Sequence, residues 1–214
     1  RWLDDAVQHR HPAHSGDVTD NDAPRDAHLR EVTVRSEQVW QGRFLDVRRD
    51  TVALPNGAQT TREYIVHPGA VMVVPLLDDG RLVMERQFRY PLRRVMLEFP
   101  AGKIDDGESP FVCGVRELEE ETGYRAAEWA RAGLLHNAMA YSDEGIEIWF
   151  ARGLSRGKAR PAAQALLEIV THSEAEIEAL CASGGITDAK SLIGLLWLQK
   201  YRAGLWPLVW QAAP

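Results

Sequence analysis

The stretch from Gly102 to Tyr124, GKIDDGESPFVCGVRELEEETGY, constrains the fold and the chemistry of this chain more than any other. Ser109 suits the N-cap of a helix, and Pro110 suits its first position. Apolar residues then recur at roughly helical spacing, and Gly123 can end the helix in the left-handed conformation. The stretch therefore predicts a glycine-bearing loop that leads into a single helix.

Three glutamates on this helix, Glu117, Glu120 and Glu121, are spaced i, i+3 and i+4 and therefore project from one face. Clustered carboxylates repel one another unless a positive charge lies among them. A hard divalent cation such as Mg²⁺ prefers oxygen ligands and often bridges carboxylates to substrate phosphates. A solvated acidic helix face is the alternative interpretation. The upstream glycine loop and Arg116 within the cluster favour a metal site.

The spacing follows a pattern of glycine, five residues, glutamate, seven residues and then Arg-Glu-Leu-x-Glu-Glu-x-Gly before an aliphatic or aromatic residue. The matching positions are Gly102, Glu108, Arg116, Glu117, Leu118, Glu120, Glu121, Gly123 and Tyr124. This stretch resembles the Nudix box of hydrolases that cut nucleoside diphosphates linked to another moiety. The resemblance implies an ion pair between Arg116 and Glu108 that holds the loop against the helix, with Gly102 and Gly123 as further structural positions. Gly114 departs from the alanine usual in the family.

The composition is that of an ordinary globular protein, since 45% of the 214 residues are hydrophobic and 26% are charged. A formal net charge of −6 argues against a nucleic-acid binder, which needs a basic surface. Cys113 and Cys181 are far apart, so no disulfide framework follows and a cytoplasmic location is expected. No apolar window approaches 18 residues and no apolar signal-peptide core is present, so neither a membrane span nor a secretory signal is expected.

We expect four regions along the chain. Residues 1–29 are polar and non-periodic, which predicts a flexible tail. Residues 30–66 alternate as strands and predict an N-terminal antiparallel β arm that mediates dimerisation. Residues 67–206 form the Nudix hydrolase domain, with the box at 102–124, and residues 207–214 form a C-terminal tail.

The order of elements predicts an α/β protein with an α/β/α sandwich, and the resemblance implies the Nudix form of this sandwich with a mixed β-sheet. Pro55-Asn56-Gly57 is a turn signal in the arm. The apolar run Ala70–Leu77 is typical of a buried central strand, which Pro75 limits or bulges. Ser173 begins a helix, and Thr187 or Asp188 caps a longer one through about Tyr201.

Three further segments resemble the ADP-ribose pyrophosphatase branch of the Nudix family: Glu98–Lys103 next to the box, Arg86–Arg89 upstream, and Ile186–Lys190 near the C-terminus. This resemblance implies a metal site made of the Ala101 backbone carbonyl and the carboxylates of Glu117 and Glu121. It also implies that Glu120 is a further ligand or orients the attacking water, so that Glu120 and Glu121 take part in catalysis.

The same resemblance implies three substrate-binding residues. Arg89 lies where these enzymes contact substrate phosphate, and a guanidinium offers paired charged donors for it. Its alternative role is a surface charge at a strand end. Phe44 either stacks on adenine or packs in the core. Arg62 either contacts substrate across a dimer or is a solvated charge on a hairpin.

A glutamate on the loop Tyr141–Glu144 is implied to activate water or to complete the metal site. Glu144 fits this role best, with Asp143 and Glu147 as substitutes. Many family members carry Pro-Gly just before this segment, whereas this chain has Ala138-Met139-Ala140. The departure affects the conformation of the loop and with it a narrow specificity for ADP-ribose.

These expectations form one hypothesis. With Mg²⁺, for which Mn²⁺ can substitute, the protein hydrolyses the pyrophosphate bond of ADP-ribose to AMP and ribose 5-phosphate. A homodimer is expected, with a nucleoside diphosphate as substrate and with neither nucleic acid nor membrane as partner. The alternatives are another nucleoside diphosphate derivative, such as GDP-mannose, ADP-glucose or a dinucleotide, and a non-catalytic Nudix-fold nucleotide sensor.

Overall fold

The computed structural model describes residues 25–157 and 166–214. The chain divides into two compact units, one with the described residues up to Glu37 and Asp50–Arg62, the other with Gln38–Arg49 and Glu63–Pro214. Of the predicted tail, residues 1–24 lie outside the described part and residues 25–29 form a turn. The division into four regions stays a prediction.

The N-terminal strands form a sheet of their own in the order β1–β2–β3. The bounds are Val32–Gln41 for β1, Asp46–Ala53 for β2 and Gln59–Val66 for β3. The turn predicted between β2 and β3 is present, because Gly57 donates its N–H to the carbonyl of Leu54 over 2.9 Å. The φ of Gly57 is +84°, a conformation that glycine adopts without a steric penalty.

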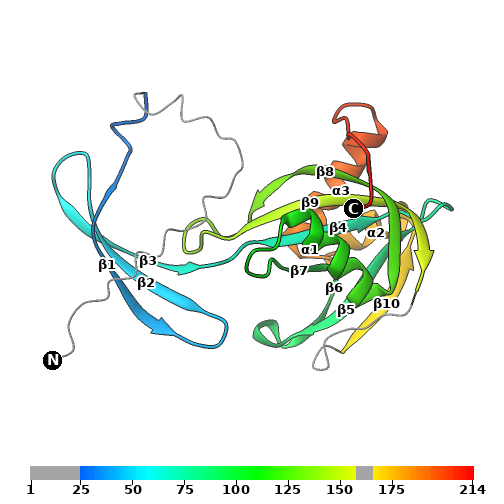
Figure 1. The fold of residues 1–214 in the computed structure, drawn as a ribbon, viewed down its shortest axis with the longest axis horizontal. Coiled ribbons are helices and arrows are strands. Elements are labelled where there is room, and N and C mark those ends of the chain that lie inside the picture. The colour runs from blue at the N-terminus through cyan, green and yellow to red at the C-terminus, as the bar shows by residue number, and fades with distance from the viewer. Residues whose placement is uncertain (1–24, 158–165) are drawn as a thin grey trace. The chain divides into compact units, whose positions relative to one another are not determined.

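A five-stranded sheet in the order β11–β8–β9–β4–β7 is the centre of the larger unit (Figure 1). Its strands are β4 (Ala70–Pro75), β7 (Ala101–Lys103), β8 (Tyr124–His136), β9 (Gly145–Arg156) and β11 (Gln211–Ala212). β4 runs parallel to β9 and antiparallel to β7, so the sheet is mixed as predicted. β4 is buried along its length and ends at Pro75, which has no N–H to continue the ladder.

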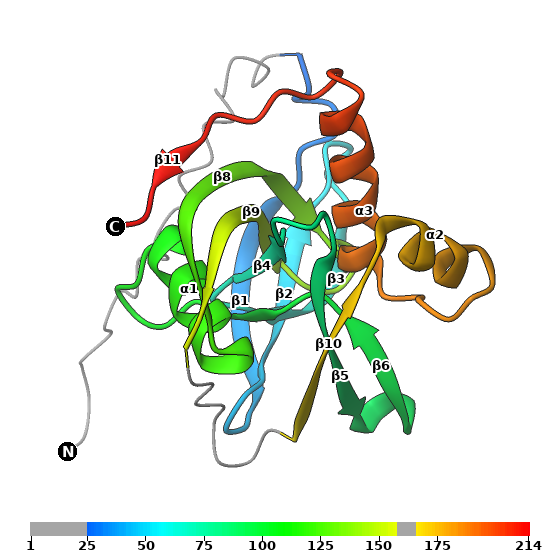
Figure 2. The ribbon, with the colours of Figure 1, turned by 90° about the vertical axis from the view of Figure 1, so that its right-hand side faces the viewer.

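Helices cover both faces of this sheet (Figure 2). They are α1 (Pro110–Glu117), α2 (Glu174–Ala182) and α3 (Ala189–Arg202). Met72 and Val74 of β4 belong to the core shared with α2 and α3, whereas Val71 and Val73 belong to the core shared with α1. Because successive side chains of a strand point to opposite faces, one buried strand supplies both cores. The α/β/α sandwich is therefore confirmed.

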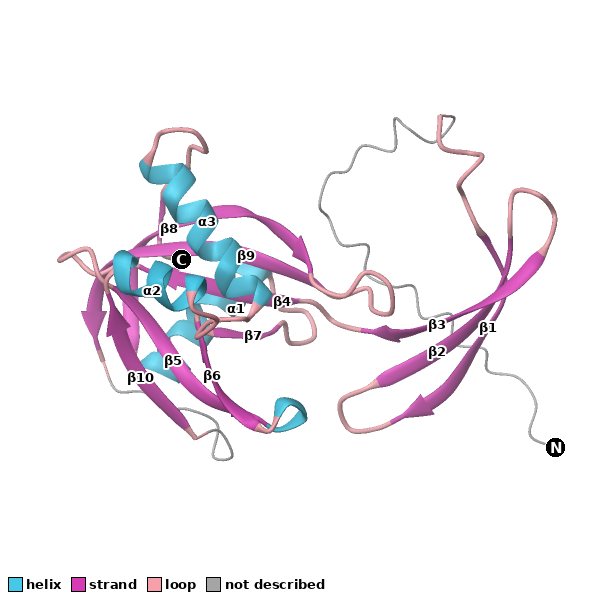
Figure 3. Cartoon of the chain, turned by 180° about the vertical axis from the view of Figure 1, so that it is seen from behind, coloured by secondary structure: helices cyan, strands magenta, loops and turns pink. Residues whose placement is uncertain are grey.

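The larger unit also contains a three-stranded sheet in the order β10–β5–β6 (Figure 3). Its strands are β5 (Leu82–Arg89), β6 (Arg94–Glu98) and β10 (Leu167–His172), and the 3₁₀ turn η2 (Tyr90–Leu92) joins β5 to β6. β5 and β6 are antiparallel, with Glu85 opposite Glu98. Two acidic residues therefore lie at paired positions on neighbouring strands.

The box helix begins as predicted but ends differently. The Ser109 hydroxyl accepts the N–H of Val112 over 3.3 Å, and Pro110 is the first helical residue. After α1, residues Leu118–Thr122 form a wider π-helical turn, η3. The Thr122 hydroxyl donates to the carbonyl of Leu118 over 2.5 Å, and Gly123 closes the turn with a φ of +74°. One uninterrupted α-helix was expected, whereas the carboxylates lie at the junction of two helical types.

Close packing accounts for Gly114. A Cβ at this position would lie 3.2 Å from Cγ1 of Val71 and 3.6 Å from the ring of Trp129. The helix therefore approaches β4 more closely than alanine allows without a shift of Val71. This packing offsets the lower helix propensity of glycine.

The C-terminal elements follow their capping signals. Ser173 forms a capping box with Glu176, and Asp188 rather than Thr187 caps α3 by accepting the N–H of Ser191. The expected C-terminal tail contains β11, whose Gln211 pairs with Trp129 of β8. A two-residue strand has no periodicity in the sequence, so this pairing could not be anticipated. No helix among the described residues combines the length and apolar character needed to cross a membrane.

Candidate active site

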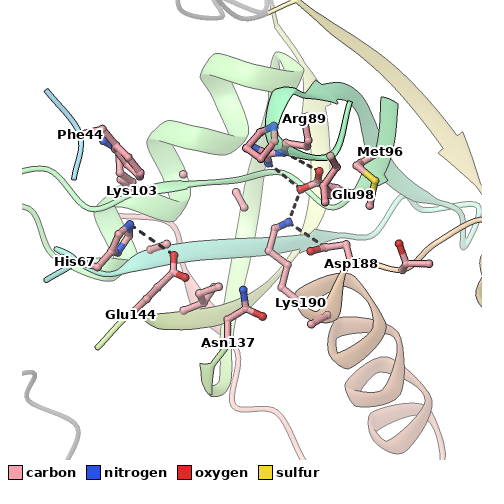
Figure 4. Close-up of a pocket in the computed structure, with 18 of the residues that line it drawn as sticks. Phe44, His67, Arg89, Met96, Glu98, Lys103, Asn137, Glu144, Asp188 and Lys190 are labelled. Carbon is pink, nitrogen blue, oxygen red and sulfur yellow. Dashed lines mark hydrogen bonds and ion pairs between the residues drawn. The ribbon is translucent and has the colours of Figure 1, made fainter. Parts of the chain in front are cut away.

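A cavity of about 870 Å³ lies within the larger unit (Figure 4). Its walls come from the ends of β5 and β6, from β7, from the loop before β9 and from the N-terminus of α3. Arg89, Ala101 and Glu144 line it, together with Phe44 from the segment between β1 and β2. Four residues that the sequence placed in different segments are therefore collected around one cavity.

Three carboxylates lie behind the cavity wall formed by Ala101 and Gly102. Glu121 accepts the N–H of Ala101 over 3.2 Å, so the carboxylate is fixed directly behind that strand. Glu117 comes from the end of α1, and Glu85 comes from β5. Glu121 belongs to the π turn, and the charges of Glu85 and Glu117 act on its carboxylate. Glu120, on the same turn, has a side chain that is 46% exposed.

Glu85 is the member of this group that sequence reasoning missed. It is fully buried, and neither carboxylate oxygen has a hydrogen-bond partner among the described residues. Burial raises the pKa of Glu85 above its ordinary value. Burial also raises the pKa of Glu121, and repulsion from the charges of Glu85 and Glu117 raises it further. The pair therefore keeps a proton into the neutral range as long as no cation neutralises it.

This donor set fits a divalent cation. Buried carboxylates are ordinarily paired with a positive charge or bound to a metal, and the orphaned oxygens of Glu85 have no such protein partner in the described part of the chain. In the described residues, no three acidic, histidine or cysteine side chains meet at metal-ligand spacing. Mg²⁺ tolerates such an open site because it retains several waters and takes further oxygens from substrate phosphates.

Arg116 organises the edge of the carboxylate group. Its Nε and Nη2 donate to the two oxygens of Glu108 over 2.9 and 2.8 Å, so the expected ion pair is present. The same guanidinium donates to Glu117 over 2.6 Å and to the carbonyl of Lys103 over 3.1 Å. The hydrogen bonds from Arg116 lower the pKa of Glu108 to about 2. Arg116 thus ties the loop to the helix and holds Glu117 at its edge.

Gly102 leaves the room that Glu117 occupies. A Cβ at Gly102 would lie 1.9 Å from both Cδ and Oε1 of Glu117, a separation that real Cβ atoms do not show. The glycine that starts the box is therefore required by close approach, whereas Gly123 is required by its positive φ.

Arg89 lines the cavity but is also tied to the protein. Its Nε and Nη2 donate to the two oxygens of Glu98, each over 2.8 Å. Lys190 of α3 contacts the same carboxylate and also Asp188, over 2.9 Å to the latter. Arg89 is therefore more than a surface charge at a strand end, because it belongs to a four-membered charged network on the cavity wall (Figure 4).

The loop before β9 directs Glu144 into the cavity, whereas Asp143 and Glu147 point elsewhere. Oε1 of Glu144 lies 3.6 Å from Nε2 of His67. Asp143 accepts the backbone N–H of His67 over 2.7 Å, and Glu147 pairs with Arg131 over 3.0 Å. Of the three acidic candidates, only Glu144 is thus placed beside the substrate space.

Phe44 and Arg62 have different surroundings. Phe44 is 57% exposed, which excludes the alternative of core packing. Its ring contacts His67 edge-on at 6.0 Å, and the Lys103 ammonium lies 4.4 Å from its centroid. Arg62 belongs to the smaller unit, where it pairs with Glu31. A role of Arg62 in substrate binding stays a prediction.

Sequence reasoning did not assign a role to Glu85, His67, Glu98 or Lys190. An acidic residue two positions after Val83 in an apolar strand was the available signal for Glu85, because it falls on the same face of the strand. Lys190 and Glu98 lay within segments used for the family resemblance, but nothing local joins two residues so far apart in sequence.

Comparison with known proteins fits this geometry. A family model described as NUDIX domain matches residues 66–183. The chain belongs to the Nudix hydrolase family. A second model, described as nucleoside diphosphate sugar hydrolase N-terminal domain, matches residues 31–65 of this Nudix hydrolase.

The Nudix hydrolase is similar to two curated ADP-ribose pyrophosphatases. One, from Bacillus subtilis, is 35% identical over 173 residues, which are 80% of this chain and 94% of that protein. The other, from Mycobacterium tuberculosis, is 34% identical over 176 residues, which are 80% of this chain and 84% of that protein. A crystal structure of an ADP compounds hydrolase superposes with a TM-score of 0.75 and 25% identity, covering 82% of this chain and 96% of the other.

Proposed function

We propose that this Nudix hydrolase cleaves the pyrophosphate bond of ADP-ribose to AMP and ribose 5-phosphate with Mg²⁺, for which Mn²⁺ can substitute. The observation that carries the proposal is the group of three carboxylates, Glu85, Glu117 and Glu121, behind a cavity lined by Arg89 and Phe44. Within this group, the fully buried Glu85 has no hydrogen-bond partner among the described residues. The names of the two similar curated pyrophosphatases support ADP-ribose as the substrate.

The residues divide between metal and substrate. Glu117, Glu121 and the Ala101 carbonyl would hold the metal, with Glu85 as an additional buried carboxylate and Glu120 at the exposed edge. When bound, a divalent cation neutralises charge on the diphosphate and makes water more acidic. Arg89 would contact the diphosphate, since its guanidinium faces the cavity and offers paired charged donors. Phe44 presents an exposed ring that suits stacking on a base.

Glu144 is proposed as the general base. It lies on the cavity wall opposite the network of Arg89, on a loop that an isolated bridge between Ile65 and Ser142 holds to the end of β3. A carboxylate on the cavity wall can accept a proton from a water directed at phosphorus. Before this loop the chain has Ala138-Met139-Ala140 where many family members carry Pro-Gly. The conformation of the loop is therefore the feature on which a narrow specificity for ADP-ribose depends.

A substrate panel tests this assignment. We expect the highest kcat/KM for ADP-ribose among ADP-ribose, ADP-glucose, GDP-mannose and a dinucleoside diphosphate, with full loss of activity in EDTA. Glu121→Gln should lower kcat by about a hundredfold or more. Glu119→Gln is the matched control, because Glu119 lies on the same turn but pairs with Arg125. A higher kcat/KM for another of these diphosphates would contradict ADP-ribose as the substrate and assign that diphosphate instead. Nucleotide binding without any turnover would support the alternative of a non-catalytic nucleotide sensor.

Two further proposals concern assembly and location. We propose a homodimer that uses the arm at residues 30–66, since a small sheet gains stability by packing against a partner. Light scattering should give the mass of two chains, and a mass of one chain would contradict the dimer.

A cytoplasmic location rests on the two unpaired cysteines, Cys113 and Cys181, and fractionation of cells that express the protein tests it.

A further inference from the structure

The N-terminus of α3 is held firmly at the cavity wall. Asp188 accepts the N–H of Ser191 over 3.0 Å, and the Ser191 hydroxyl accepts the N–H of Phe99 over 3.0 Å. Gly194, one turn further, packs so closely that a Cβ would lie 2.8 Å from Cε of Met72. The backbone of α3 is therefore fixed against the strand end that carries Glu98, and Lys190 projects from this fixed position.

Glu98 is held by two cations at once. Oε2 of Glu98 accepts from Nη2 of Arg89 over 2.8 Å and also contacts Nζ of Lys190. The Glu98 side chain is 3% exposed and that of Lys190 is 11% exposed, whereas that of Arg89 is 38% exposed. Burial alone would raise the pKa of Glu98, but the hydrogen bonds and charges of Arg89 and Lys190 outweigh it and leave this pKa below its ordinary value.

The guanidinium of Arg89 therefore has two interactions to satisfy, one with the substrate and one with Glu98. It is the exposed member of the network and faces the substrate space, yet it neutralises a buried carboxylate. If Glu98 had no other cation, movement of Arg89 towards a diphosphate would leave a buried charge poorly compensated. Lys190 is the second cation, and its own pairing with Asp188 keeps the network neutral.

On the basis of the proposed function, we propose that Lys190 is a positioning residue that neutralises Glu98 and so releases Arg89 to bind the substrate diphosphate. Lys190 does not itself contact phosphate in this account. Without Lys190, Glu98 retains Arg89 more strongly, and the diphosphate has to compete with a buried carboxylate for the guanidinium. Loss of Lys190 should therefore weaken substrate binding more than it slows the chemical step.

The experiment is a double-mutant cycle read by the Kd of ADP, measured by calorimetry, and by KM and kcat for ADP-ribose. Lys190→Met should weaken ADP binding and raise KM about tenfold, with kcat changed by less than about threefold. Lys190→Arg should restore both constants to within about threefold of wild type, because a guanidinium can also neutralise Glu98.

The second half of the cycle distinguishes a positioning role of Lys190 from direct contact of Lys190 with phosphate. In a Glu98→Gln background, Lys190→Met should change the Kd of ADP by less than about twofold, because no carboxylate remains to retain Arg89. This double variant also leaves no unpaired charge at Glu98, so it keeps the test valid if Lys190→Met alone folds poorly.

Persistence of the tenfold loss in the Glu98→Gln background would show direct contact of Lys190 with phosphate and overturn the proposal. An unchanged Kd in Lys190→Met would also overturn it. The ADP measurement is independent of the substrate assignment. A wild-type protein that binds ADP without hydrolysing ADP-ribose would refute the proposed function and leave the cycle interpretable.

Discussion

Replacement of Gly102 by alanine is expected to inactivate the enzyme without unfolding it. The new Cβ would lie 1.9 Å from Cδ and Oε1 of Glu117, whereas ordinary contact begins near 3.4 Å, so the carboxylate has to move by roughly 1.5 Å. The φ of Gly102 is not in the left-handed region, so alanine brings no backbone strain of its own. The effect of Gly102→Ala should therefore come entirely from displacement of the Glu117 carboxylate.

The structure allows estimates of the loss of stability and of the loss of kcat in Gly102→Ala. Overpacking of a filled site costs about 1–3 kcal/mol. The reduced freedom of the unfolded chain offsets about 0.5 kcal/mol of this. The free energy of unfolding should thus fall by about 0.5–2.5 kcal/mol. A displacement of more than 1 Å at a ligand carboxylate should lower kcat about a hundredfold.

The assay compares Gly102→Ala with Gly80→Ala by urea unfolding and by initial rates with ADP-ribose. Gly80 lies in the turn between β4 and β5, with a φ of +84° and no neighbouring atom within 4 Å of the place that a Cβ would occupy. Its replacement should therefore cost about 1 kcal/mol through backbone strain and change kcat by less than about twofold. Equal rates in the two variants would refute the steric reasoning.

Other predictions concern the charges of the site. Burial raises the pKa of Glu85 and Glu121, so the metal-free folded state binds more protons than the unfolded state above about pH 4.3, and its stability should fall as the pH rises from about 6 to 9. Mg²⁺ should raise the unfolding temperature most at the higher pH, and a stabilisation independent of pH would contradict this. Glu85→Gln should stabilise the metal-free protein by about 1 kcal/mol or more at pH 8 and weaken the response to Mg²⁺, as scanning fluorimetry can show. Arg116→Met should cost about 2–3 kcal/mol in urea unfolding because it leaves Glu108 and Glu117 without their donor, and an unchanged midpoint would argue against that role.

The parts of the fold with local signals could be predicted from the sequence. Ser109 caps the start of the box helix and Gly123 closes its last turn, both as expected, because capping depends on a few adjacent residues; the π-helical character of that last turn was not expected. The apolar run that begins at Ala70 became the central strand and ended at Pro75. The sandwich follows from such elements in their order, and the family match covers the same region.

The rest depends on contacts between distant segments. In the π turn, the Thr122 hydroxyl donates to the Leu118 carbonyl and Glu121 accepts the N–H of Ala101 in β7, and sequence spacing reveals neither contact. Glu85 reaches the carboxylate group from another sheet, and Lys190 reaches Glu98 across 92 residues of sequence. Sequence spacing therefore identified the chemistry of the site but not the buried charges that tune it.

Single-turnover formation of AMP from ADP-ribose, measured with enzyme in excess over substrate, tests the central claim most directly. With Mg²⁺, the wild-type protein and Glu119→Gln should convert the substrate to equal amounts of AMP and ribose 5-phosphate. Glu121→Gln should slow this step by about a hundredfold or more. Equal rates in Glu121→Gln and wild type, or an undiminished rate in EDTA, would contradict a metal-dependent mechanism built on the buried carboxylates.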